Sequence, residues 1–253
     1  MSEVTGFIPT TTISMKPSGA GKPYQNVNLI NPIRINSFVA DGESTEYVLD
    51  TQNLDTSYQP IVKINGTPTT DFTTNFTNGK ITFTQAPPIS DTDGKDNVTI
   101  QFSKTISGYA DRIRKCTKAI EFDNRIFFTG NPDYPTTLFH SELYDPTYVD
   151  DQNYYTEGND TTPIKGMVAG NNALWVFKEP NQENTTIYYH VPTTYINDLG
   201  EEEKAYITTH SSISTGCVAD AINFGDDIKS DVMTYPSGIE VMPIREKLTI
   251  NID

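Results

Sequence analysis

Two stretches of sequence decide the fold: Ala119–Phe128, which reads AIEFDNRIFF, and Met167–Val176, which reads MVAGNNALWV. Each combines an apolar strand, a tight turn of Asn or Asp, and a second, strongly apolar strand. Asn and Asp tolerate the positive φ that a two-residue hairpin turn requires. A third stretch, Ala221–Ile228 (AINFGDDI), repeats the first strand and the turn. The pattern predicts one hairpin used three times.

Aligning the three turns places Asn124, Asn172 and Asp226 in one column, at spacings of 48 and 54 residues. A hairpin that recurs at this period is typical of propeller blades, which stack because one blade cannot bury both faces of its sheet. We therefore predict an all-β chain with propeller-like blades over residues 106–228. The alternative is a chance likeness within some other β fold.

The third copy is incomplete, because the polar run KSDVM follows Ile228 where an apolar inner strand is expected. A closed propeller usually needs about four blades or more, and at most two and a half are visible. We expect a partial propeller and a divergent tail over residues 229–253. Either the chain is part of a longer one, or partners cover its open edges.

Residues 33–105 predict a small antiparallel β module of about six short strands. Its turns are marked by Asp41-Gly42, Asn65-Gly66 and Asn78-Gly79, dipeptides that permit positive φ. The strand after the last of them, Lys80–Thr84, alternates polar and apolar residues. Residues 1–32 are rich in Thr, Pro, Gly and Ser and show no period, so we expect an extended N-terminal arm, either free or wrapped around a neighbouring subunit.

The charge argues against two classes of function, nucleic-acid binding as a main activity and binding to anionic membranes. The 253 residues carry 33 acidic and 18 basic side chains, a formal net charge of −15. Such a surface repels the phosphate backbone of nucleic acids and anionic membranes. The sequence also has no run of apolar residues long enough to span a bilayer, and no secretion signal at its start.

No motif predicts a catalytic residue, a metal site or a cofactor. His140-Ser141-Glu142 lacks the frame of a nucleophile elbow, so we expect His140 to be structural. Cys116 and Cys217 are expected to be buried free thiols, with a disulfide between them as the alternative. The acidic loop Asp91–Asp96 departs from the EF-hand order and is expected to be a solvated turn, with calcium binding as the alternative.

The most distinctive stretch, residues 130–155, interleaves tyrosines, carboxylates and prolines. We interpret it as a proline-stiffened loop between blades that packs its tyrosines against a neighbouring subunit, since Tyr is favoured at protein interfaces. The alternative is a sugar site, with paired carboxylates that could hydrolyse a glycan. The candidate interface residues are Tyr134, Tyr144, Tyr148, Tyr154 and Tyr155.

Several segments of the chain together suggest a family. They are Ala40–Gly42, Ile64–Gly66, Ile81–Pro87, Asn97–Ile100, Phe122–Pro132, Leu138–Leu143, Asp145–Tyr148, Ala173–Glu179 and Gly216–Ile228. Through them the sequence resembles tailed-bacteriophage virion proteins, the stabilisation proteins related to tail-nozzle and head-completion proteins. The resemblance covers residues 35–228 and includes a β module like one found in phage tail and fibre proteins. It implies a β-propeller with an inserted β module, no enzymatic activity and a ring assembly.

We therefore expect a virion structural protein of the tail or head-to-tail junction, made in the host cytoplasm. Its partners would be portal, adaptor or tail subunits and further copies of itself in a ring. An acidic wall would let DNA pass without gripping it. The alternatives are a carbohydrate-binding or glycan-cleaving module of a phage fibre, and a non-functional remnant of a deleted gene.

Overall fold

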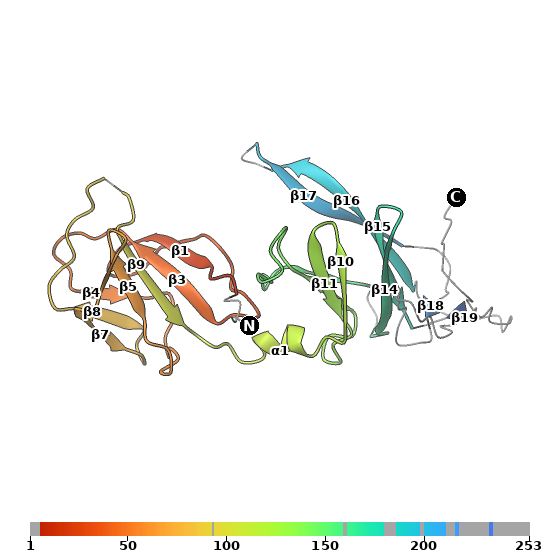
Figure 1. Ribbon diagram of the computed structural model, residues 1–253, viewed down its shortest axis with the longest axis horizontal. Helices are drawn as coiled ribbons and strands as arrows, with labels where there is room; N and C mark the ends of the chain where they lie inside the picture. The colour runs from red at the N-terminus through yellow and green to blue at the C-terminus, as the bar shows by residue number, and fades with distance from the viewer. Residues whose placement is uncertain are drawn as a thin grey trace, which may run out of the picture. The chain divides into compact units, whose positions relative to one another are not determined.

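The computed structural model describes residues 6–92, 94–158, 161–179, 186–197, 200–210, 216–217 and 233–234 (Figure 1). The chain divides into two compact units. The first comprises Met1–Ala110 together with Thr147–Gln152, and the second comprises Asp111–Pro146 together with Asn153–Asp253. Both units are built from β-strands, which confirms the predicted all-β class.

The first unit is a sandwich of two sheets around one apolar core, to which Phe38, Ile100 and Tyr47 contribute. One sheet has six strands in the order β2-β1-β3-β9-β5-β6, and the other has three in the order β4-β8-β7. The strands are β1 Thr10–Met15, β2 Lys22–Pro23, β3 Ile33–Phe38, β4 Glu46–Val48, β5 Ile61–Ile64, β6 Thr67–Thr69, β7 Phe72–Asn75, β8 Lys80–Phe83 and β9 Val98–Ser103.

The turns of this unit follow the prediction. Asn65 and Gly66 have φ of 49° and 77° and join β5 to β6, and Gly79 has a φ of 62° just before β8. A side chain at Gly79 would also collide with the backbone, because an added Cβ would lie 1.9 Å from the carbonyl oxygen of Thr51. Gly is therefore required there on two counts.

The N-terminal arm is extended, but it does not stand apart from the module. Its strand β1 pairs in parallel with β3, with irregular register, and β2 pairs with β1. Thr11 and Thr12 face Asn36, whose amide donates to both hydroxyls at 3.0 and 2.7 Å. Polar contacts fix this strand, which explains why no apolar period marks it. The expected antiparallel module thus includes one parallel pair.

The short helix α1, Tyr109–Arg114, spans the boundary between the two units, where no helix was expected. Two four-stranded antiparallel meanders follow, here called the first and second blade. The first blade contains β10 Lys118–Phe122, β11 Arg125–Thr129, β12 Thr137–His140 and β13 Tyr154–Thr156. The second contains β14 Ile164–Gly170, β15 Ala173–Lys178, β16 Ile187–Ile196 and β17 Glu202–His210.

The predicted hairpins are the inner strands of these blades. Asp123 and Asn124 turn between β10 and β11 with φ of 48° and 60°, and Asn171 and Asn172 turn between β14 and β15 with φ of 50° and 55°. Both turns have positive φ at both central residues, as a type I′ turn requires. The aligned column therefore marks equivalent turns in two propeller-like blades, as predicted.

The two blades share one apolar core. Phe127 and Leu138 of the first blade pack with Met167, Leu174 and Val176 of the second, and all five are 5% exposed or less. After the second blade, β18 Gly216–Cys217 pairs with β19 Met233–Thr234. The predicted third hairpin, Ala221–Ile228, lies outside the described residues, as does most of the tail.

The tyrosine-rich stretch differs from the prediction. It lies within the first blade, where it contains β12, rather than between blades. Its Thr147–Gln152 segment belongs to the first unit. There Val149 accepts a hydrogen bond from the Leu29 N–H at 2.8 Å, and Asp150 forms a bridge with Asn28. These backbone contacts with the arm hold the segment in the first unit.

Candidate interaction surface

The first blade carries aromatic side chains on the face opposite to the shared core. Strand register aligns Ala119, Phe128, Phe139 and Tyr154 in one row across β10 to β13. The Tyr134 ring lies 5.7 Å from the Phe139 ring, which in turn lies 6.3 Å from the Tyr154 ring. Tyr134 is 38% exposed and Tyr154 46% exposed. We call this row, with Tyr134, the aromatic row.

Helix α1 contributes a cation to the aromatic row. The guanidinium of Arg112 lies 5.8 Å from the centre of the Tyr134 ring. The Asn131 amide holds the helix by donating to the backbone oxygens of Asp111 and Arg112 at 3.0 and 2.8 Å. An aromatic ring beside an Arg is a common composition at the centre of protein interfaces.

The five predicted tyrosines are not all on the surface. Tyr134, Tyr144 and Tyr154 are exposed, and Tyr144 is the most exposed of them at 72%. Tyr148 is 6% exposed, because its ring stacks on Phe7 of the arm at 4.6 Å. Its hydroxyl donates to the backbone oxygen of a neighbouring arm residue.

Tyr155 points the other way from Tyr154, into the shared core. Its ring lies 5.4 Å from His140 and 5.0 Å from His190. Burial raises the pKa of its hydroxyl. Neighbours on a strand face opposite sides of the sheet, so only one of these two tyrosines can serve an external interface.

The second blade is also apolar on the face opposite to the shared core. Val168, Trp175 and Tyr189 form one cross-strand row, and Trp175 stacks on Tyr189 at 4.8 Å. Phe177 and Ile187 form the next row. We call this set the outer face of the second blade. A sheet with apolar side chains on both faces needs a further layer on each side.

A polar network that sequence reasoning missed lies buried between the blades. Nε2 of His190 is 2.7 Å from Oε1 of Glu157, and Nδ1 is 3.0 Å from Oγ1 of Thr208. Nζ of Lys178 donates to the backbone oxygen of Glu157 at 2.8 Å. The side chains of His190 and Glu157 are 0% and 1% exposed. Glu157 follows the first blade and the others belong to the second, so the network fastens blade to blade.

Lys178 is the one residue of this buried network that stands out in the sequence. It closes the apolar strand Ala173–Lys178 and is fully buried. A charged residue in such a strand needs a buried polar partner. Glu157, whose backbone oxygen is one such partner, stands in a polar loop. Nothing in the sequence distinguishes it there from a solvated carboxylate.

The His140-Ser141-Glu142 stretch has structural contacts. Ser141 Oγ accepts the Ile126 N–H at 3.0 Å and donates to the backbone oxygen of Glu142 at 3.0 Å. Nδ1 of His140 is 3.0 Å from the backbone oxygen of Ser141 rather than from its hydroxyl. Burial lowers the pKa of His140 to about 4, so its imidazole is neutral at pH 7. These contacts tie β12 to β11.

Among the described residues, no three or more His, Cys, Asp or Glu side chains gather as metal ligands would. In the acidic loop, Asp93 lies outside the described residues, and the Asp96 carboxylate accepts the Ser14 N–H. Cys116 is a free, half-buried thiol whose pKa burial raises to about 11. The side chain of Cys217 lies outside the description.

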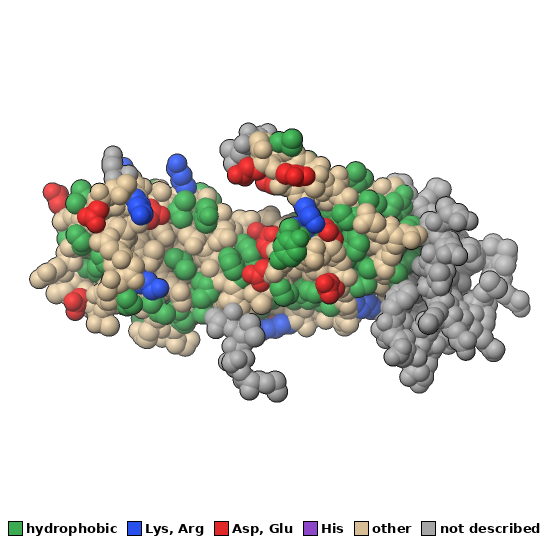
Figure 2. All heavy atoms as spheres, turned by 45° about the horizontal axis from the view of Figure 1, so that its top comes forward, with side chains coloured by type: hydrophobic (Ala, Val, Ile, Leu, Met, Phe, Trp, Pro, Cys, Tyr) green, Lys and Arg blue, Asp and Glu red, His purple; other side chains and the backbone are tan. Residues whose placement is uncertain are grey.

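The acidic character of the chain is visible on the surface. Figure 2 shows acidic side chains gathered on the β16–β17 hairpin and over the first blade. The hairpin contributes Glu201, Glu202 and Glu203, all of them exposed. In the part of the chain that the structure describes, no helix has the length and apolarity needed to cross a membrane.

No protein-family model matches this sequence, and no curated protein is significantly similar to it.

Proposed function

We propose that this chain is a structural subunit of a bacteriophage virion, located in the tail or the head-to-tail junction. It acts by assembling with further copies of itself and with portal, adaptor or tail subunits. The proposal rests on the phage resemblance of the sequence together with one structural observation. That observation is the apolar character of the faces that the two blades turn away from their shared core.

In the first blade this face is the aromatic row, which includes exposed Tyr134 and Tyr154. In the second blade it includes Trp175 and Tyr189, both partly exposed. Val168 and Phe177 on the same face of the second blade are already buried within the chain, at 4% exposed each. Blades stack because such faces must be covered, and the aromatic side chains left partly exposed are of the kind found at interaction sites. Neighbouring subunits supply the cover in this proposal.

The net charge of −15 supports a conduit role. A wall of like charge repels DNA and lets it pass without binding. The proposal therefore includes no nucleic-acid binding. Retention of the purified chain on double-stranded DNA at physiological salt would contradict this part of it.

The experiment is co-expression of the full chain with the products of its neighbouring reading frames, followed by purification and negative-stain electron microscopy. The proposal predicts that the chain co-purifies with a portal, adaptor or tail protein and that ring-shaped particles form. If the chain purifies alone beside each of these proteins, and no particle forms, the proposal is wrong.

A further inference from the structure

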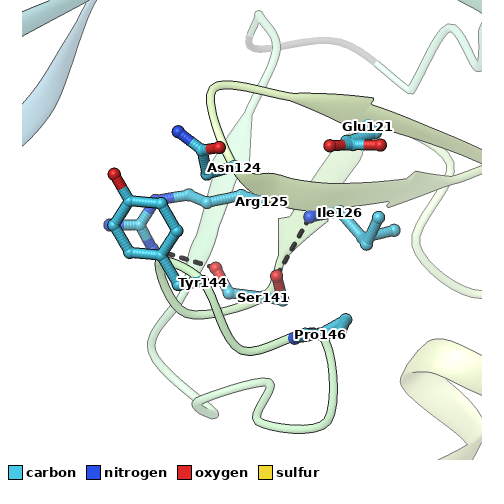
Figure 3. A pocket seen from close by; sticks show the side chains of 7 residues that line it. All are labelled: Glu121, Asn124, Arg125, Ile126, Ser141, Tyr144 and Pro146. Carbon is cyan, nitrogen blue, oxygen red and sulfur yellow. Dashed lines mark hydrogen bonds between the residues drawn. The ribbon is translucent and has the colours of Figure 1, made fainter.

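A hollow of about 290 Å³ opens on the first blade beside the β10–β11 turn (Figure 3). Figure 3 shows Asn124, Arg125 and Tyr144 on one side of it and Glu121 and Ile126 on the other. The hollow lies entirely within the second unit and shares no lining residue with the aromatic row.

The floor of the hollow is rigid. Ser141 is fully buried, and its hydroxyl and backbone are both bonded to Ile126. Nη1 of Arg125 donates to the backbone oxygen of Ser141 at 2.9 Å and lies 3.5 Å from a Glu142 carboxylate oxygen. The Arg125 side chain is only 10% exposed, yet its Nε has no hydrogen-bond partner. A buried donor without a partner is costly and calls for an explanation.

Tyr144 provides a second, independent observation. Its φ is 60°, a left-handed conformation that Gly or Asn adopts at far lower cost than Tyr. Its N–H donates to the Asn124 backbone oxygen at 2.9 Å, which fixes the ring beside the hollow. Residues held in such conformations cluster at functional sites, where the structure around them bears the cost. The exposed ring at this strained position is therefore a candidate for a role in binding.

We propose that this hollow binds a neutral saccharide. A sugar ring is amphipathic, with C–H faces that pack on an aromatic ring and hydroxyls that bond to planar polar groups. Tyr144 offers the aromatic face, while Asn124, Glu121 and Arg125 offer the planar polar groups. A small number of polar groups around an apolar surface is the usual composition of a small-ligand site.

The charges favour a neutral ligand over an anionic one. The lining contains one cation, Arg125, and one anion, Glu121, and the Glu142 carboxylate already lies beside the guanidinium. The chain as a whole carries −15. An anionic ligand would meet no net positive charge, whereas hydroxyls need only the hydrogen bonds. This binding is additional to the virion role and does not depend on it.

The test is a glycan array of neutral hexoses, N-acetylhexosamines and their oligomers, followed by calorimetric titration with the strongest-binding sugar. Tyr144→Gly removes the ring but relieves the left-handed strain, so we expect the variant to remain folded. We expect it to weaken sugar binding by roughly tenfold or more while its unfolding midpoint is unchanged or higher. If Tyr144 had only a structural role, the substitution would lower both the affinity for the sugar and the unfolding midpoint.

Two further variants complete the design. Asn124→Gly keeps the turn and removes the amide, and we expect weaker binding. Tyr24→Ala removes an equally prominent tyrosine, 62% exposed, from the first unit, and binding should not change. The proposal is wrong if the array shows no bound sugar, or if Tyr144→Gly and Asn124→Gly bind the sugar as the parent chain does.

Discussion

The two blades start alike and end differently. Both open with a hairpin of two apolar strands and a type I′ turn. In the first blade the next strands shorten to 4 and 3 residues, and loops rich in Tyr and Pro replace them. In the second blade the corresponding strands lengthen to 10 and 9 residues (Figure 1).

This difference indicates that the inner hairpins and the outer strands have separate structural roles. The inner hairpins supply most of the shared core, where packing density leaves little room for change. The outer strands add some core residues, such as Leu138 and Tyr188, but they differ between the blades in length and exposure. The outer part of the first blade carries the exposed tyrosines, Tyr144 at the hollow among them. The outer part of the second blade is a two-stranded ribbon with exposed Tyr195, Ile196 and Ile207.

The largest expected effect concerns the buried network that joins the blades. Glu157→Ala removes the buried side chain that pairs with His190 and leaves that imidazole without its partner. We expect a loss of about 3–5 kcal/mol in the free energy of unfolding, the range found when one partner of a buried pair is removed. Urea titration followed by Trp175 fluorescence measures it.

The matched control is Glu179→Ala. Glu179 pairs with Lys165 at 3.8 Å, but its side chain is 49% exposed, so the loss should stay below about 1 kcal/mol. Equal effects in the two variants would show that the network does not hold the blades together.

The next effect is a dependence of stability on pH through His140, whose pKa is lowered to about 4 in the folded chain. Above the unfolded pKa, about 6.5, the imidazole is neutral in both states and the full stability is present. Between about 6.5 and 4 only the unfolded chain takes up the proton, so stability falls with the pH. The loss from this residue is about 3 kcal/mol.

His140→Phe removes the titrating group and keeps an aromatic ring in the core. Between pH 7 and pH 4, the free energy of unfolding of this variant should fall by less than that of the parent chain. A variant with the same slope as the parent would assign the acid sensitivity to other groups.

A smaller effect distinguishes the two turns. Asp123 of the first blade also accepts hydrogen bonds from Lys204 at 2.9 Å and from the Tyr206 hydroxyl at 3.0 Å. Burial, together with this bond to Asp123, raises the pKa of Tyr206. Asp123→Gly keeps the turn but loses both bonds, at a cost of about 1–2 kcal/mol. Thermal unfolding of this variant measures the cost.

The equivalent substitution in the second blade is Asn171→Gly, which should be neutral within about 0.5 kcal/mol because Gly suits the turn. A larger loss for Asn171→Gly than for Asp123→Gly would reverse the assignment of roles.

The sequence was sufficient for features that depend on local pattern. Asn-Gly and Asn-Asn turns, alternating strands and the repeated hairpin all depend on neighbouring residues, and the structure contains them. It was insufficient where contacts join distant residues. The β1 strand is fixed by Asn36, and Glu157 meets His190 across 33 positions. Neither carries a local signal.

The candidate surface was predicted in part. Composition alone selected five tyrosines, but strand alternation separates Tyr154 from Tyr155, and the arm covers Tyr148. Tyr144 became a candidate ligand contact because of its backbone conformation and the hollow beside it. Neither feature can be predicted from the sequence of a loop whose path is unknown.

Sedimentation velocity of the full chain, over a range of concentrations, tests the central claim most directly. We predict a discrete oligomer well above the 28.2 kDa of one chain. Tyr134→Ser combined with Tyr154→Ser should shift the distribution toward the monomer, while Tyr24→Ala should not. A single 28.2 kDa species at every concentration would contradict the claim that the outer faces of the blades are built for self-assembly.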